Sequence, residues 1–146
     1  MRKNALRLPL FSFALVLGLS LVASLGCSSK SPQEKILAER ARWDVLLLNY
    51  LQDDETLEIT MSTRLSGPRG SSLQSLTVEF LLEAEGGEAL PSIWHSYDLT
   101  KVENGGPLDV TVRKPSSGRI AGLGVVSPSL PISAEDQSNL AELQGL

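Results

Sequence analysis

Cysteine and histidine, two residue types that often supply nucleophiles and bases, each occur once in the 146-residue chain. A single thiol cannot form a disulfide within the chain or a multi-cysteine metal site, so Cys27 offers chemistry only through its own sulfur. In an extended strand His95 shares a face with Tyr97, whereas Asp98 points to the other side. The segment therefore lacks an oriented histidine–aspartate pair, and we predict a packed or surface histidine.

Carboxylates are the next candidates, because calcium takes about six to eight oxygen ligands. The densest acidic group, 53–55 with Glu58, lacks both the alternating spacing and the glycine of a calcium-binding loop. We predict a solvated turn there and no metal site. Glu79, Glu83 and Glu85 alternate along one predicted strand, so we expect them on the water-facing side of an edge or hairpin.

Two further patterns suggest ligand binding but have simpler explanations. Gly122 and Gly124 match half of a dinucleotide-binding fingerprint, yet Ser127 stands at the third glycine position and no helix is expected to follow. We interpret them as strand glycines that allow close packing. Trp43 and Trp94 could stack on a ligand, although aromatic residues more often anchor a core or a sheet edge. No cofactor is expected.

The elements that would position these residues begin with an export signal. Arg2, Lys3 and Arg7 precede an uncharged apolar stretch, 8–26, as in secretory signal peptides. Residues 1–26 hold three of the 13 basic side chains and none of the 17 acidic ones, so the remainder carries a net charge of −7. That charge argues against a nucleic-acid binder, which neutralises phosphates with a basic face.

Gly26 and Cys27 end the apolar stretch, and here the chain resembles bacterial lipoproteins. Their lipobox reads Leu, a small residue, Gly or Ala, then Cys; Ser24 and Leu25 depart from its first two positions. The resemblance implies cleavage between Gly26 and Cys27, a diacylglycerol on the Cys27 sulfur and an acyl chain on its amine. Ser28, in place of an inner-membrane retention Asp, implies the outer membrane, facing the periplasm. The alternative is an uncleaved signal anchor, because the stretch nearly suffices to span a bilayer.

A tether and a short helix are predicted within 27–42. Ser31 as N-cap and Pro32 at the first helical position favour a helix to the end of this segment. The segment 43–51 fits either a continuation of that helix or a strand. We favour a strand in which 45–48 are buried on both faces, because the downstream chain is patterned as a sheet.

The rest of the chain alternates apolar and polar residues, which is typical of half-buried strands. Turn residues separate the segments, among them Gly86 and Gly87 at a predicted hairpin. Six such strands predict a mainly β protein, a single small antiparallel β-sandwich over 43–126. A proline-broken tail, 127–146, contains a short predicted helix, 133–143. The predicted strands after 43–51 are 56–66, 76–85, 88–99, 108–113 and 119–126.

The third predicted strand resembles FxLYD-type, immunoglobulin-like domains of bacterial envelope proteins. Phe80 and Leu82 match the Phe-x-Leu part of that motif, whereas Glu83 and Ala84 replace the usual Tyr and Asp. A turn then precedes the returning strand, as in those domains. The resemblance spans roughly 57–126 and implies an immunoglobulin-like sandwich, without a specific activity.

These observations favour a lipid-anchored envelope lipoprotein that acts as a non-enzymatic binding or structural module, with the membrane and an envelope protein as partners. One alternative is an enzyme, a hydrolase or lyase acting on cell wall or polysaccharide, in which His95 works with acids from other strands. Another is a small-ligand carrier with a dry cavity between its sheets, lined by Trp43 or Trp94.

Overall fold

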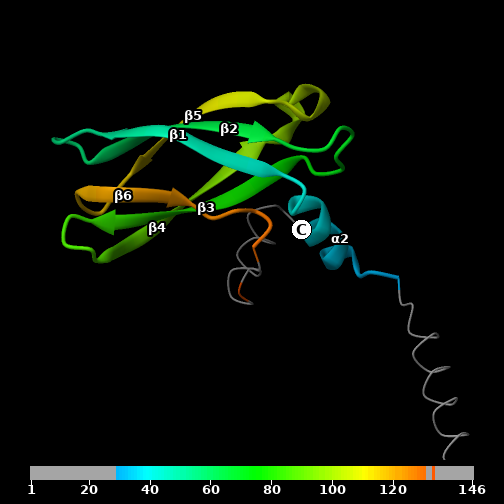
Figure 1. Cartoon of the computed structure of the whole chain (residues 1–146), viewed down its shortest axis with the longest axis horizontal. Coiled ribbons are helices and arrows are strands. Elements are labelled where there is room, and N and C mark those ends of the chain that lie inside the picture. Colours follow the sequence, from blue (N-terminus) through cyan, green and yellow to red (C-terminus); the bar gives the residue numbers. More distant parts are fainter. Residues whose placement is uncertain (1–28, 131–132, 134–146) are drawn as a thin grey trace, which may run out of the picture. The chain divides into compact units, whose positions relative to one another are not determined.

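Six strands in two stacked sheets make up the body of the protein in a computed structural model (Figure 1). The structure describes residues 29–130 and 133. The predicted signal peptide, Cys27 with its cleavage site, and nearly all of the predicted tail helix lie outside these residues. The predicted class, a mainly β antiparallel sandwich, is confirmed. The first sheet has the order β1 (Asp44–Gln52), β2 (Glu58–Ser66), β5 (Leu108–Pro115), and the second β4 (Ala89–Asp98), β3 (Ser75–Ala84), β6 (Ile120–Val125).

The ambiguous segment 43–51 folds as strand β1, so the helix alternative is wrong. Helix α2 spans Pro32–Arg40 and ends before it. The prediction that 45–48 are buried on both faces is also wrong, because β1 is an edge strand with one face on the core. Leu46 and Leu48 are 53% and 43% exposed, and Leu48 is the extra residue of a bulge opposite β2.

Alternating side chains from both sheets meet in the core, as the period-two pattern predicts. β2 starts at Glu58, two residues later than predicted, because Leu57 adopts a left-handed conformation with φ 58° in the preceding turn. Gly87, with φ 82°, lies in the predicted hairpin between β3 and β4. The buried apolar residues are Trp43, Val45, Ile59, Met61, Leu65, Leu76, Val78, Phe80, Leu82, Ile93, Tyr97, Leu99 and Val112.

A chain of hydrogen bonds crosses this core between the sheets. The Tyr97 hydroxyl on β4 donates to Thr63 Oγ1 on β2 at 2.9 Å. Thr63 Oγ1 in turn donates to the carbonyl oxygen of Val110 on β5 at 3.0 Å. Burial raises the pKa of Tyr97 to about 12, so its hydroxyl stays protonated and can donate. The chain of bonds satisfies two hydroxyls whose burial would otherwise destabilise the core.

Arg40, the last residue of α2, is buried although it is charged. Its Nη1 donates to the carbonyl oxygen of Thr77 on β3. Just beyond β6, Val126 donates its N–H to the Glu79 carbonyl at 2.9 Å. β6 ends at Val125 and the chain turns at 127–130, so the ladder between β3 and β6 does not extend to Thr77. The Arg40 guanidinium thus donates to a carbonyl beyond the end of that ladder, and burial lowers its pKa.

Trp43 packs at one end of the sandwich against the backbone of Gly67. A Cβ on Gly67 would overlap the Trp43 ring, so only glycine fits there. Gly105, with φ 84°, accepts a hydrogen bond from the Gly67 N–H at 2.8 Å. The indole Nε1 of Trp43 donates to Ser71 Oγ at 3.2 Å. Trp43 is therefore a core anchor, as predicted, and we call these four residues the Trp43 corner.

Candidate functional site

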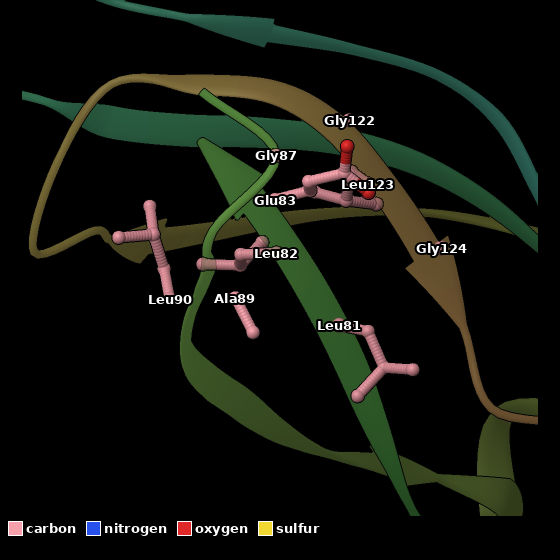
Figure 2. A pocket seen from close by; sticks show the side chains of 9 residues that line it. All are labelled: Leu81, Leu82, Glu83, Gly87, Ala89, Leu90, Gly122, Leu123 and Gly124. Atoms are coloured by element: carbon pink, nitrogen blue, oxygen red, sulfur yellow. The ribbon is translucent and has the colours of Figure 1, made fainter. Parts of the chain in front are cut away.

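A hollow of about 480 Å³ opens on the second sheet, over β3 and β6 (Figure 2). Its lining is mostly apolar, and its size falls within the range of ligand-binding pockets. We call it the β6 glycine hollow. Three strands and a turn line it: Leu81, Leu82 and Glu83 on β3, Gly87 in the following turn, Ala89 and Leu90 at the start of β4, and Gly122, Leu123 and Gly124 on β6.

The hollow exists because β6 carries no side chains at two positions. A Cβ added to Gly124 would meet no atom within 4 Å, and one on Gly122 would meet the Glu83 Cβ at 3.6 Å, an ordinary contact. Neither glycine has a positive φ. The prediction that these glycines allow close packing is therefore wrong. Since glycine in a strand costs about 0.5–1 kcal/mol relative to alanine, the fold gains nothing from the empty space.

Acidic side chains flank the hollow. Leu81 lies between Glu79 and Glu83 along one face of β3 and is 53% exposed. Within the described chain, no ion pair joins either glutamate to a basic side chain. The predicted hairpin position of these glutamates is confirmed, although β3 is the central strand of its sheet and Glu85 lies beyond its end, in the turn.

His95 does not line the hollow; it is half-buried on β4 and shares a face with Tyr97, as predicted. Its ring packs edge-on against Tyr97, with ring centroids 4.6 Å apart. Burial and, to a smaller extent, the positive charge of Lys114 lower the pKa of His95, so the imidazole is neutral at pH 7. The charge that acts on this ring is thus that of a cation, Lys114, whereas the histidine of a catalytic triad is oriented by a carboxylate.

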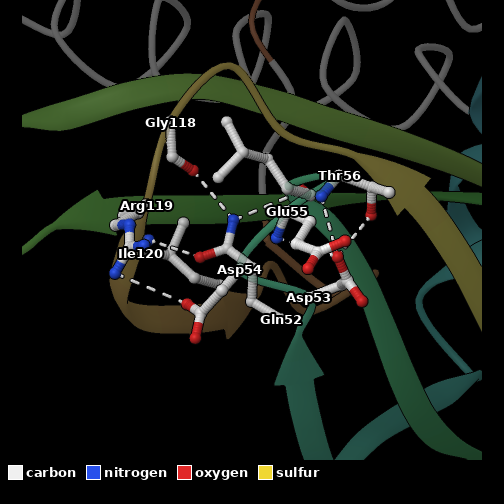
Figure 3. Close-up of polar contacts among 9 residues, drawn as sticks. Gln52, Asp53, Asp54, Glu55, Thr56, Gly118, Arg119 and Ile120 are labelled. Carbon is white, nitrogen blue, oxygen red and sulfur yellow. Dashed lines mark hydrogen bonds and ion pairs between the residues drawn. The ribbon is translucent and has the colours of Figure 1, made fainter.

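The acidic run after β1 forms a solvated turn, as predicted (Figure 3). Asp53 Oδ1 accepts hydrogen bonds from the N–H of Thr56 at 2.7 Å, the Thr56 hydroxyl at 2.9 Å and the N–H of Glu55 at 3.0 Å. These bonds, led by those from Thr56, lower the pKa of the Asp53 carboxyl. Asp54 pairs with Arg119 at 3.5 Å. Asp53 thus holds the turn itself, and Asp54 joins it to the loop before β6. The described residues contain no group of three that could hold a metal ion.

Gln52, the last residue of β1, joins the edges of the two sheets (Figure 3). Its side-chain amide donates to the Gly118 carbonyl and accepts from the Ile120 N–H, both at 2.9 Å. The amide thereby imitates the backbone of a neighbouring strand and links β1 to β6. Sequence reasoning missed this role, because a glutamine at a strand end gives no signal for partners 66 and 68 residues away.

A second hollow, of about 340 Å³, lies among the loops beside Trp43. Polar groups make up most of its lining, which includes Ser72 and Thr100. It therefore differs from the dry cavity between the sheets that the carrier hypothesis requires. Trp94, half-buried on β4, lines neither of these two hollows.

No protein-family model, no curated protein and no solved structure matches this chain. No helix in the described ranges is long and apolar enough to cross a membrane. The resemblances to bacterial lipoproteins and to FxLYD-type domains therefore stay predictions. Of the two hollows described above in residues 29–130, the β6 glycine hollow is the better candidate, because it is mostly apolar and flanked by carboxylates, and the packing of the sandwich does not require it.

Proposed function

We propose that the protein is a lipid-anchored lipoprotein of the cell envelope that binds another envelope protein and catalyses no reaction. Its signal peptide is removed after Gly26, Cys27 carries the lipid, and its body stands at the outer membrane, facing the periplasm. The observation that carries the binding role is the β6 glycine hollow, an empty apolar surface beside Gly124 that the fold does not need.

The sequence supports the membrane address. A basic start, an uncharged apolar stretch and the Gly26–Cys27 pair follow one another in the order of an export signal with a lipid acceptor. Each buried methylene contributes about 0.8 kcal/mol, so two or three acyl chains hold a protein stably on a bilayer. The net charge of −7 that remains without residues 1–26 argues against attachment through anionic headgroups.

Intact-mass spectrometry of the membrane-extracted protein tests the anchor. We expect a chain that starts at Cys27 and carries a diacylglycerol and an amide-linked acyl chain. Cys27→Ser should retain residues 1–26, because serine has no sulfur for the thioether, whereas the matched control Ser29→Ala should be processed like the wild type. A wild-type chain that starts at Met1 with a free thiol contradicts the anchor.

Site-directed variants test the binding role. Gly124→Leu places a large side chain in the hollow, and Thr111→Leu adds the same side chain at an exposed position on β5 of the other sheet. After cross-linking in intact cells, we expect a partner band that is retained by Thr111→Leu and lost by Gly124→Leu. A band that both variants retain would show that the partner binds elsewhere.

A further inference from the structure

We infer that the β6 glycine hollow receives an apolar side chain of a protein partner, flanked in that partner by lysine or arginine. The inference rests on the proposed function and names the chemistry of the partner. Three features carry it: the space itself, the exposed leucine in its lining, and the carboxylates on either side of that leucine.

The space is large enough for a bulky apolar side chain. About 480 Å³ lies open on the sheet, so a segment that crosses β3 and β6 can insert a side chain without parting the two sheets. Because no atom lies within 4 Å of a Cβ added to Gly124, the room extends down to the strand backbone. Leu81, 53% exposed, would be covered by such a side chain, and removing its apolar surface from water favours binding.

The flanking charges select a basic segment. Glu79 and Glu83 lie two residues to either side of Leu81 on the same face of β3, and Glu83 also lines the hollow. The ion pairs of the described chain all lie elsewhere, so both carboxylates are available to a partner. A basic residue beside the inserted side chain would be attracted, and an acidic one repelled. Anionic lipid headgroups would be repelled in the same way.

The test uses the full chain in phosphatidylcholine nanodiscs, titrated calorimetrically with short peptides against protein-free nanodiscs. The probe is acetyl-Lys-Lys-Leu-Lys-Lys-amide, and two analogues carry serine in place of leucine or glutamate in place of lysine. We expect the leucine probe to bind at least about tenfold more tightly than the serine probe, because only leucine places an apolar side chain in the hollow. The glutamate probe should show no heat of binding above the empty nanodiscs.

Variants locate the binding on the protein. Gly124→Leu should weaken the leucine probe at least about tenfold, whereas Thr111→Leu should leave its affinity unchanged. Glu83→Gln should weaken it only about threefold, because an exposed ion pair contributes little. Its matched control is Glu58→Gln, which removes an exposed carboxylate at the start of β2 in the other sheet and should have no effect.

Equal affinities for the leucine and serine probes would overturn the inference, as would unchanged leucine-probe binding in Gly124→Leu and Glu83→Gln together. The mass of the same preparation separates this failure from that of the proposed anchor. An acylated Cys27 without probe binding refutes the inference alone. A chain that binds the probe but retains residues 1–26 refutes the anchor alone.

Discussion

Two pairs of glycines in this sandwich have opposite relations to their surroundings. In the Trp43 corner, Gly67 and Gly105 face neighbouring atoms so closely that a Cβ on either would overlap them. In the β6 glycine hollow, Gly124 faces open space and Gly122 makes only an ordinary contact. Packing therefore explains the glycines of the corner, whereas it does not explain those of the hollow.

The difference shows what a glycine in a β protein can mean. Each glycine costs free energy in a strand or turn because it increases the freedom of the unfolded chain. At the corner, the contact of Trp43 with the backbone of Gly67 offsets that cost. At the hollow, no contact within the described chain offsets the free-energy cost of the glycines. Residues that lower stability in this way are expected at functional surfaces.

The largest effect that tests this comparison is expected at the corner. Gly67→Ala forces its methyl group into the Trp43 ring, and overpacking of this kind destabilises a protein by about 3 kcal/mol at its upper range. Urea unfolding of the full chain, followed by tryptophan fluorescence, measures the free energy of unfolding. Gly86→Ala is the matched control, because a Cβ there meets nothing within 4 Å. Similar losses in both variants would show that the corner is not specially constrained.

A smaller effect is expected where the two sheets meet through hydrogen bonds rather than through close packing. Tyr97→Phe removes the hydroxyl that donates to Thr63, and we expect a loss of about 1 kcal/mol in the free energy of unfolding. Thr63 keeps its bond to Val110 in that variant. In a double-mutant cycle with Thr63→Val, the combined loss should fall short of the sum of the single losses. Strict additivity would mean that the two hydroxyls do not interact.

The strands could be predicted from the sequence because their burial repeats over a few neighbouring residues. In β2, for example, Ile59, Met61 and Leu65 face the core in the predicted alternation. The exposure of Leu46 and Leu48 could not be predicted in this way. It depends on β1 lying at the edge of its sheet, and the order of strands is set by pairings between distant segments.

The candidate site could be predicted in part only. Gly122 and Gly124 stand out in the sequence, but whether a strand glycine faces a neighbour or open space depends on what lies beside it in the fold. Here the neighbours are Leu81 and Glu83, which are brought beside them by the pairing of β3 with β6. No local pattern in either strand predicts that juxtaposition, so sequence reasoning found the residues and assigned them the wrong role.

The smallest expected effect tests whether packing requires the glycine at position 124 in the hollow. Gly124→Ala adds a methyl group where no atom lies within 4 Å, and it reduces the freedom of the unfolded chain. We expect the free energy of unfolding to rise by about 0.5 kcal/mol, in the same urea titration. Gly105→Ala should instead lower it, because Gly105 combines φ 84° with a close approach to Gly67.

A loss of stability in Gly124→Ala would mean that packing needs this glycine after all, and the case for a binding surface would lose its premise. If stability rises, alanine at position 124 makes the protein more stable than the glycine that is present there. The methyl group leaves most of the 480 Å³ empty, so the leucine probe should bind to Gly124→Ala as it does to the wild type, whereas Gly124→Leu should weaken it at least about tenfold. Stability would then rise with the first added methyl group, whereas binding would be lost only with a large side chain, as expected of a site that is kept open for a partner.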